Sequence, residues 1–173
     1  MADGVFQIEV VTPEASLLDA AARSVVLRSS DGDLTVLDGH TPLITDVVPC
    51  EVRVEPDEGE RVRLAVHGGY LQVETGTPAD AEGDAAASSD RSTRVTLLAG
   101  VAELADEIDV ARAEQAKAAA EARLAESPSA GARSGSGGEG AEHTERSDEL
   151  ERAAAHAALR RAEVRLQVAG APS

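Results

Sequence analysis

The chain has 173 residues, enough for one hydrophobic core with an appendage but too few for several large domains. Its formal net charge is −16, from 32 acidic and 16 basic residues, and such a chain repels a phosphate backbone, so we expect no nucleic-acid partner. Aromatic residues make up only 1% of the sequence, which leaves Val, Leu, Ile and Ala to build the core and argues against an enzyme with a large aromatic ligand pocket.

The chain shows no membrane-directed segment. The first residues lack a basic region followed by an apolar run, and no later segment is apolar enough to cross a bilayer, so we expect a soluble chain without direct membrane insertion. Cys50 is the single cysteine, which excludes an internal disulfide. Its place in an alternating segment predicts a buried small hydrophobe rather than a reactive or metal-binding thiol.

Residues 1–100 are predicted to form an all-β domain. Apolar residues recur at every second position in two clear runs, Phe6, Ile8 and Val10, and then Cys50, Val52 and Val54. Turn residues punctuate these runs at short intervals, at Pro13, Gly32, Gly39, Gly59 and the pair Gly68 and Gly69. This spacing is typical of an antiparallel β-sandwich. A second pattern, rich in Gly, Pro, Ala, Ser and Asp, fills residues 75–93 and predicts a disordered loop insertion within a hairpin.

After residue 100 the apolar period lengthens toward that of a helix. Residues 101–126 are predicted to form a first helix, with Leu104, Ile108 and Ala111 on one face and Asp109 as a cap. A Ser- and Gly-rich stretch, residues 127–147, predicts a flexible linker. Residues 148–173 are predicted to hold a second helix that begins at Asp148, with Glu151 at capping-box spacing, and is stopped by Gly170 and Pro172.

The second helix carries two adjoining apolar stripes. One contains Leu150, Ala154, Ala157, Val164 and Val168, and the other contains Leu159, Ala162 and Leu166. Because alanine contacts bury little area, the two helices are predicted to form an α-helical hairpin that docks closely but weakly.

Several motifs in order resemble the epsilon subunit of F-type ATP synthases. They are Val10-Val11-Thr12-Pro13-Glu14, Gly39-His40-Thr41-Pro42-Leu43, His67-Gly68-Gly69-Tyr70-Leu71, and Ile108-Asp109-Val110-Ala111-Arg112-Ala113 at the start of the tail. The two low-complexity segments depart from the usual compact pattern of the family.

The resemblance implies a non-catalytic rotor subunit that couples proton translocation to ATP synthesis by docking the gamma subunit to the c ring, beside the alpha and beta subunits. It implies a peripheral position on the cytoplasmic face of the plasma membrane. It also implies that the turn with Gly32 and Asp33 faces the c ring and that Gly39, His40 and Pro42 lie near gamma. For His40, a hydrogen bond to the neighbouring backbone and a direct partner contact are both open, whereas His67 is interpreted as structural.

The resemblance further implies a regulatory tail, whose extended form restrains ATP hydrolysis. No cofactor is required, but ATP is implied as a regulatory ligand, bound by residues that match the family motif, Glu103, Ile108, Asp109 and Arg112. Arg161 and Arg165 lie one turn apart on the second helix, and this spacing predicts that they face the phosphates together. A local basic patch is predicted to meet an acidic loop of the catalytic beta subunit, through Arg152, Arg160, Arg161 and Arg165. Alternatively, these arginines simply form a solvated helix face, where their charges near the C-terminus interact favourably with the helix dipole.

Other classes of function remain as alternatives. A free-standing β-sandwich adaptor, whose helical tail binds an unrelated protein, would show the same elements. We find no nucleophile with a base, no cofactor loop and no metal-ligand spacing among His40, His67 and Cys50, so neither an enzyme nor a metal site is predicted.

Overall fold

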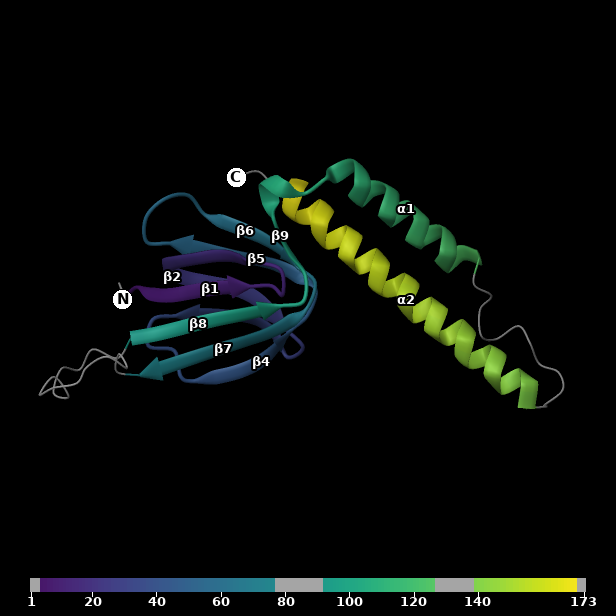
Figure 1. Cartoon of the computed structure of the whole chain (residues 1–173), viewed down its shortest axis with the longest axis horizontal. Helices are drawn as coiled ribbons and strands as arrows, with labels where there is room; N and C mark the ends of the chain where they lie inside the picture. The colour runs from purple at the N-terminus through teal and green to yellow at the C-terminus, as the bar shows by residue number, and fades with distance from the viewer. Residues whose placement is uncertain (1–3, 77–91, 127–138, 171–173) are drawn as a thin grey trace, which may run out of the picture. The chain divides into compact units, whose positions relative to one another are not determined.

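A computed structural model describes residues 4–76, 92–126 and 139–170 of the chain (Figure 1). Its contacts divide the chain into two compact units. The first contains Met1–Ile108 together with Gln167–Ser173, and the second contains Asp109–Leu166. The predicted insertion at residues 75–93 and the predicted linker at residues 127–147 lie largely outside the described residues.

The first unit is a nine-stranded β structure in the part of the chain that is described. Its strands are β1 (Phe6–Val11), β2 (Ser16–Ser29), β3 (Gly32–Leu37), β4 (Leu43–Val47), β5 (Cys50–Pro56), β6 (Val62–Val66), β7 (Gly69–Gly76), β8 (Ser92–Ala99) and β9 (Ala102–Leu104). A short 3₁₀ helix, η2 (Ala105–Glu107), follows β9.

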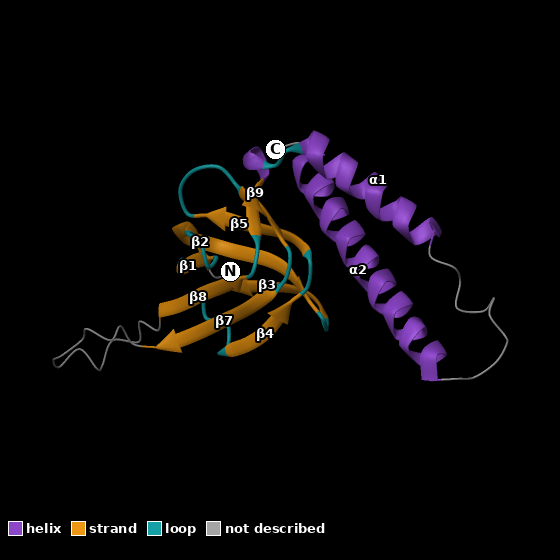
Figure 2. Ribbon diagram, turned by 45° about the vertical axis from the view of Figure 1, so that its right-hand side comes forward, coloured by secondary structure: helices purple, strands orange, loops and turns teal. Residues whose placement is uncertain are grey.

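The strands pair in the order β4-β7-β8-β1-β2-β5-β6-β9, and β3 pairs with β2. The first half of β2 pairs with β1, and its second half pairs with β3 and β5, with a register shift between Ala22 and Ser24. A bulge of this kind bends a strand, so β2 passes from one layer to the other and the predicted β-sandwich is confirmed (Figure 2). The first layer contains β4, β7, β8, β1 and the first half of β2, and the second layer contains the second half of β2 with β3, β5, β6 and β9. One pair, β1 with β8, is parallel, whereas a wholly antiparallel sandwich was predicted.

The core lies between the two layers and is aliphatic. The alternating runs point inward as predicted: Ile8, Val10, Val52 and Val54 are 0% exposed. They pack in one cluster with side chains from six further strands, including Val25, Val36, Leu64, Leu71 and Leu97. Phe6 is the aromatic side chain of this cluster, so the core is assembled from small branched residues that suit a thin double layer.

Cys50 lies in this core and is buried, as predicted. Its Sγ lies 3.8 Å from the carbonyl oxygen of Arg28. Burial raises the pKa of the thiol because the thiolate would be poorly solvated there. Cys50 therefore behaves as a small hydrophobe.

The glycine pair before β7 serves two different needs. Gly68 has a φ of 111°, in a region that L side chains rarely adopt. At Gly69, a Cβ atom would lie 2.2 Å from the carbonyl oxygen of Leu98, because β7 and β8 approach each other closely there. Both the strained turn and the close approach are expected of a glycine pair inside a strand pattern.

The sheet extends past the predicted domain boundary at residue 100. Residues 102–104 were predicted to belong to the first helix, but they form β9, which pairs with β6 through Leu64 and Leu104. Leu104 packs against the sandwich core, so burial in the sheet outweighs its helical spacing from Ile108.

The second unit contains α1 (Val110–Glu126) and most of α2 (Glu139–Gly170). Asp109 caps α1 as predicted, because its Oδ1 accepts a hydrogen bond of 3.0 Å from the backbone N–H of Arg112. The predicted start of the second helix at Asp148 is wrong. The helix begins at Glu139, so residues 139–147 are helical rather than linker, and Asp148 with Glu151 is inside it. Ala, Glu and Arg favour helix, and they extend α2 past the cap signal.

The two helices lie side by side within their unit (Figures 1 and 2). Their buried faces contain alanines spaced seven residues apart, Ala113 and Ala120 on α1 and Ala155 and Ala162 on α2. The first predicted stripe is wrong at Leu150, Ala154 and Ala157, which are exposed, but its last two members, Val164 and Val168, are buried as predicted. Ala162 of the second predicted stripe is also buried. Alanines allow close approach but remove little apolar area from water, so few kcal/mol hold this face together.

Replacing Gly69 by Ala should lower the free energy of unfolding by about 2 kcal/mol or more, because the new methyl group overlaps a strand backbone that cannot move aside. Gly100→Ala is the matched control, since nothing lies within 4 Å of its added Cβ atom. Urea unfolding of the full chain, followed by circular dichroism, measures both. Equal stability of the two variants would contradict the close approach of β7 and β8.

Candidate functional site

The turn between β2 and β3 holds the predicted residues Gly32 and Asp33. Gly32 has a φ of 132° and closes the turn. The Oγ of Ser29 accepts a hydrogen bond of 3.2 Å from the N–H of Asp31 and donates one of 3.2 Å to the carbonyl of Gly32. The neighbouring Ser30 Oγ donates to Asp46 Oδ1 at 2.7 Å, which ties the turn to β4. The turn is exposed and has a defined shape.

Asp33 is held by an arginine from the opposite strand. Arg28 on β2 faces Asp33 on β3, and its Nε and Nη2 lie 2.7 and 3.3 Å from the two carboxylate oxygens. The hydrogen bond and charge of Arg28 lower the pKa of the Asp33 carboxyl, and Asp33 raises the pKa of the Arg28 guanidinium. The ion pair therefore favours the ionised form of Asp33.

The turn between β3 and β4 holds Gly39, His40 and Pro42. Gly39 has a φ of 77°, and the N–H of His40 donates to the Leu37 carbonyl at 3.1 Å. His40 Nδ1 lies 2.8 Å from the carbonyl oxygen of Thr41, so Nδ1 carries the proton because a carbonyl oxygen only accepts. The local hydrogen bond predicted as one role of His40 is therefore present.

These two turns lie at opposite ends of β3, which spans Gly32–Leu37. At roughly 3.3 Å per residue, they are about 20 Å apart. The predicted contact residues thus form two separate surfaces, consistent with two different partners.

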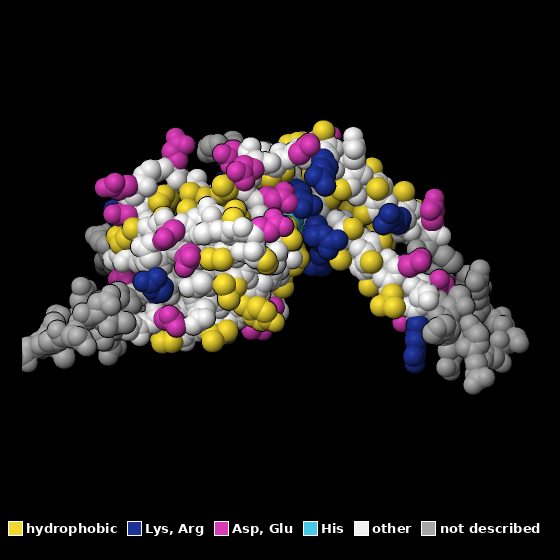
Figure 3. Space-filling model, in the orientation of Figure 1, with side chains coloured by type: hydrophobic (Ala, Val, Ile, Leu, Met, Phe, Trp, Pro, Cys, Tyr) yellow, Lys and Arg dark blue, Asp and Glu magenta, His cyan; other side chains and the backbone are white. Residues whose placement is uncertain are grey.

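An exposed apolar patch on the outer face of the first layer was missed by sequence reasoning. Tyr70 on β7 and Leu98 on β8 are paired across the ladder, and Ile44 lies on the neighbouring strand β4; they are 62%, 49% and 72% exposed. Hydrophobic side chains gather over β4 and β7 on the visible face (Figure 3). The alternation of side chains along a strand could have located this patch, because Tyr70 precedes the buried Leu71 and so points outward.

The predicted ATP-binding residues are divided between the two units. Glu103 lies on β9 rather than on a helix, with its Oε1 3.9 Å from Nε2 of the buried His67, and Ile108 is buried at the end of the first unit. In the second unit, Asp109 caps α1 and Arg112 is exposed.

The predicted basic patch lies on α2. Arg160 and Arg161 are exposed, whereas Arg152 and Arg165 are half-buried. Neighbouring side chains three and four residues apart share a helix face, so Arg161 and Arg165 meet the spacing for one phosphate or carboxylate.

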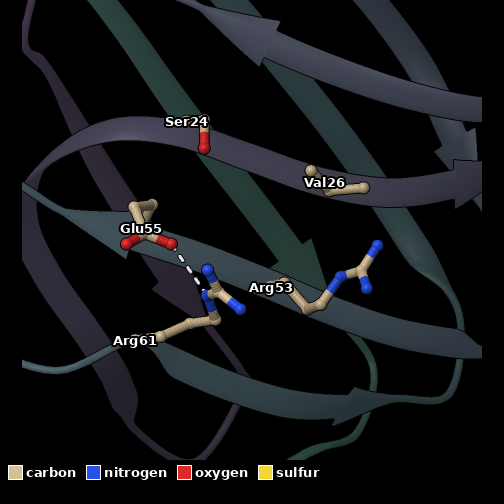
Figure 4. Close-up of a pocket in the computed structure, with 5 residues that line it drawn as sticks. All are labelled: Ser24, Val26, Arg53, Glu55 and Arg61. Carbon is tan, nitrogen blue, oxygen red and sulfur yellow. Dashed lines mark hydrogen bonds and ion pairs between the residues drawn. The ribbon is translucent and has the colours of Figure 1, made fainter.

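A shallow hollow of about 240 Å³ lies on the outer face of the second layer (Figure 4). It is lined by Ser24 and Val26 from β2, Arg53 and Glu55 from β5, and Arg61, whose Nε lies 2.7 Å from Glu55 Oε2. Ser24 has no histidine among these neighbours, so the hollow lacks the pairing that activates a hydroxyl. Among the described residues, no group of three or more His, Cys, Asp or Glu side chains is placed to hold a metal ion.

Comparisons with known proteins agree with this architecture. Residues 5–77 match the β-sandwich domain of the ATP synthase delta/epsilon chain, and residues 106–134 match its long α-helix domain. The chain is 37% identical over 115 residues to the ATP synthase epsilon chain of Desulforudis audaxviator, covering 66% of this chain and 71% of the relative. It is 36% identical over 108 residues to that of Streptomyces griseus, covering 62% and 73%.

A solved structure shares the fold. A chain of the Euglena gracilis mitochondrial ATP synthase, determined as an OSCP/F1/c-ring assembly, matches with a TM-score of 0.66 at 19% identity, covering 99% of this chain and 87% of that one.

The sandwich, the helical pair and these relatives define a subunit rather than an enzyme, and the chain belongs to the ATP synthase epsilon chain family. It is therefore a non-catalytic rotor subunit of the F1 part of the synthase, and the comparisons do not support the adaptor alternative. In the described residues, no helix is both long and apolar enough to cross a membrane.

The Asp33 carboxyl should titrate below its ordinary value of about 3.9, and Arg28→Gln should return its pKa to that value. Since the folded-state pKa is depressed, its contribution to stability is full above the unfolded pKa and is lost as pH falls through the folded pKa. Carbon-detected NMR titration measures the midpoint. Arg23→Gln, which removes an arginine paired with Asp57 instead, is the control and should leave the midpoint unchanged. An unshifted Asp33 would contradict the ion pair.

Proposed function

We propose that the sandwich docks the chain onto the gamma subunit and the c ring, and that the helical unit regulates ATP hydrolysis by the assembled synthase. The observation that carries the docking is the exposed patch of Ile44, Tyr70 and Leu98 on an otherwise well-packed sandwich. Large apolar side chains gathered on one face of a subunit favour a protein partner over water.

The two exposed turns supply two further contacts. Gly32 and Asp33 would face the c ring, and Gly39, His40 and Pro42 would lie against gamma. Their separation along β3 supports a division between partners, because one small contact could not cover both ends of the strand. Both turns are fixed by hydrogen bonds, so docking orders few residues and loses little entropy.

The assembled chain would sit on the cytoplasmic face of the plasma membrane, where the synthase couples proton flow to ATP synthesis. It would be held there through its protein partners. The net charge of −16 disfavours direct contact with anionic lipid, which supports attachment through protein alone.

The helical unit has the properties of a regulatory element. The buried residues of α1 and α2 are alanines and valines, so the pair is held by a small apolar area and can rearrange at low cost. The arginines of α2 would then meet acidic segments of the alpha and beta subunits, and the contact would weaken with salt.

In the synthase, replacing Arg160 and Arg161 by Ala should raise ATP hydrolysis severalfold, because the inhibitory contact with the acidic segments loses two exposed charges. Arg146→Ala is the matched control, since Arg146 is also an exposed arginine of α2 but lies outside the patch. A chain that ends at Ala125 should be activated at least as strongly.

Assembly is measured in the same preparations by recovery with gamma. Unchanged hydrolysis with normal assembly would overturn the regulatory role. Failure of the unmodified chain to assemble would overturn the docking.

ATP is the regulatory ligand we propose for the helical unit. Arg112 and Arg161 are exposed and thus open to a triphosphate, and Arg165 follows Arg161 by one turn. Asp109 uses Oδ1 to cap the helix, and the second oxygen of its carboxylate is the one we propose accepts a hydrogen bond from the nucleotide.

Labelled ATP should bind the isolated chain saturably, and Arg161→Ala should weaken binding about tenfold because a charge-assisted hydrogen bond is lost. Arg146→Ala serves again as the control and should leave the affinity unchanged. Absence of saturable binding at millimolar ATP would remove nucleotide from the proposed regulation.

A further inference from the structure

Two threonine hydroxyls reach from the sheet to the turn between β3 and β4. The backbone N–H of Gly39 donates to Thr93 Oγ1 at 2.8 Å, and Thr75 Oγ1 donates to the carbonyl of His40 at 2.9 Å. Thr75 on β7 and Thr93 on β8 are directly opposite each other in the ladder. This cross-strand pair, the threonine clamp, therefore bonds two successive residues of the turn, Gly39 and His40.

The environment makes these bonds consequential. Thr93 is a polar side chain that is only 1% exposed, and Thr75 is half-buried. A buried hydroxyl without a partner costs free energy, so the bond between Thr93 and Gly39 favours the observed position of the turn.

The turn makes few contacts of its own. Gly39, Thr41 and Pro42 are exposed, and the φ of 77° at Gly39 leaves the backbone free to take other conformations. The bonds of His40 to Leu37 and to Thr41 stay within the turn and its strand, and they set its shape rather than its direction. The direction in which the turn presents His40 comes from the two hydroxyls.

We propose that Thr75 and Thr93 are positioning residues for docking: they hold the turn so that His40 and Pro42 are presented to the gamma subunit before the two proteins meet. The inference rests on the proposed function. A turn that is already ordered binds without losing that freedom, so loss of either hydroxyl weakens docking although neither threonine touches the partner.

Thr93→Val keeps the shape of the side chain and removes the hydroxyl, whereas Thr93→Ser keeps the hydroxyl. In the full chain, Thr93→Val should speed hydrogen exchange at the Gly39 amide about tenfold and weaken the affinity for purified gamma about fivefold. Thr93→Ser should restore both values. Thr35→Val, at an exposed threonine in the middle of β3 and outside the patch of Ile44, Tyr70 and Leu98, is the control and should change neither.

A double-mutant cycle between Thr93 and His40 distinguishes a positioning role of Thr93 from an effect on the stability of the whole domain. In a His40→Ala background, Thr93→Val should cause little further loss of gamma affinity, because the side chain that the clamp presents is already absent. An equal fivefold loss in both backgrounds would overturn the proposal. Thr75→Val repeats the test at a half-buried position if Thr93→Val does not fold.

The remaining outcomes distinguish failure of the clamp from failure of the proposed docking to gamma. Unchanged gamma affinity in both valine variants would overturn the clamp and leave the proposed function standing. Failure of the unmodified chain to bind gamma would overturn the proposed docking, and the role of the clamp in it, even if Gly39 exchange still depended on Thr93.

Discussion

The first unit depends on one strand that belongs to both layers. β2, Ser16–Ser29, pairs with β1 through its first half and with β3 and β5 through its second, and the shift at residues 22–24 turns it between them. Ala22 is 0% exposed at this bend, where a larger side chain would have to fit between the layers. Because β2 fixes both layers at once, the turns at either end of β3 inherit defined positions from it.

The period-two runs at Phe6, Ile8, Val10 and at Cys50, Val52, Val54 were sufficient to predict the sandwich, because burial of one face imposes alternation on local sequence. The order of strands in a sheet imposes no comparable pattern on the local sequence. The parallel pairing of β1 with β8 joins segments from opposite ends of the domain, and nothing in either segment distinguishes a parallel neighbour from an antiparallel one. β9 was missed because three residues are too few to show a period.

In the candidate site, too, local features could be predicted from the sequence and long-range contacts could not. The turns around Gly32 and Gly39 could be found from sequence because glycine at positive φ is a local requirement, and the family motifs marked the same residues. The hydroxyl that receives the Gly39 amide is 54 residues away in the chain, so no motif or spacing could join the two. In the second helix, the prediction was correct at Val164 and Val168, where larger apolar residues mark the buried side. It was wrong at Ala154 and Ala157, because alanines on every side of a helix do not show which side is buried.

The ladder between β7 and β8 has a consequence for how this chain could lengthen. The strands stay in register as far as Gly76 opposite Ser92, so the chain leaves the sandwich and re-enters it at adjacent points. The entropy of closing a loop grows only with the logarithm of its length, so added residues there cost little once the ends are joined. The paired threonines stand one step inside this exit, between it and the turn they hold. Because the two threonines are paired within the ladder, the length of chain between its two ends does not change how they meet the turn.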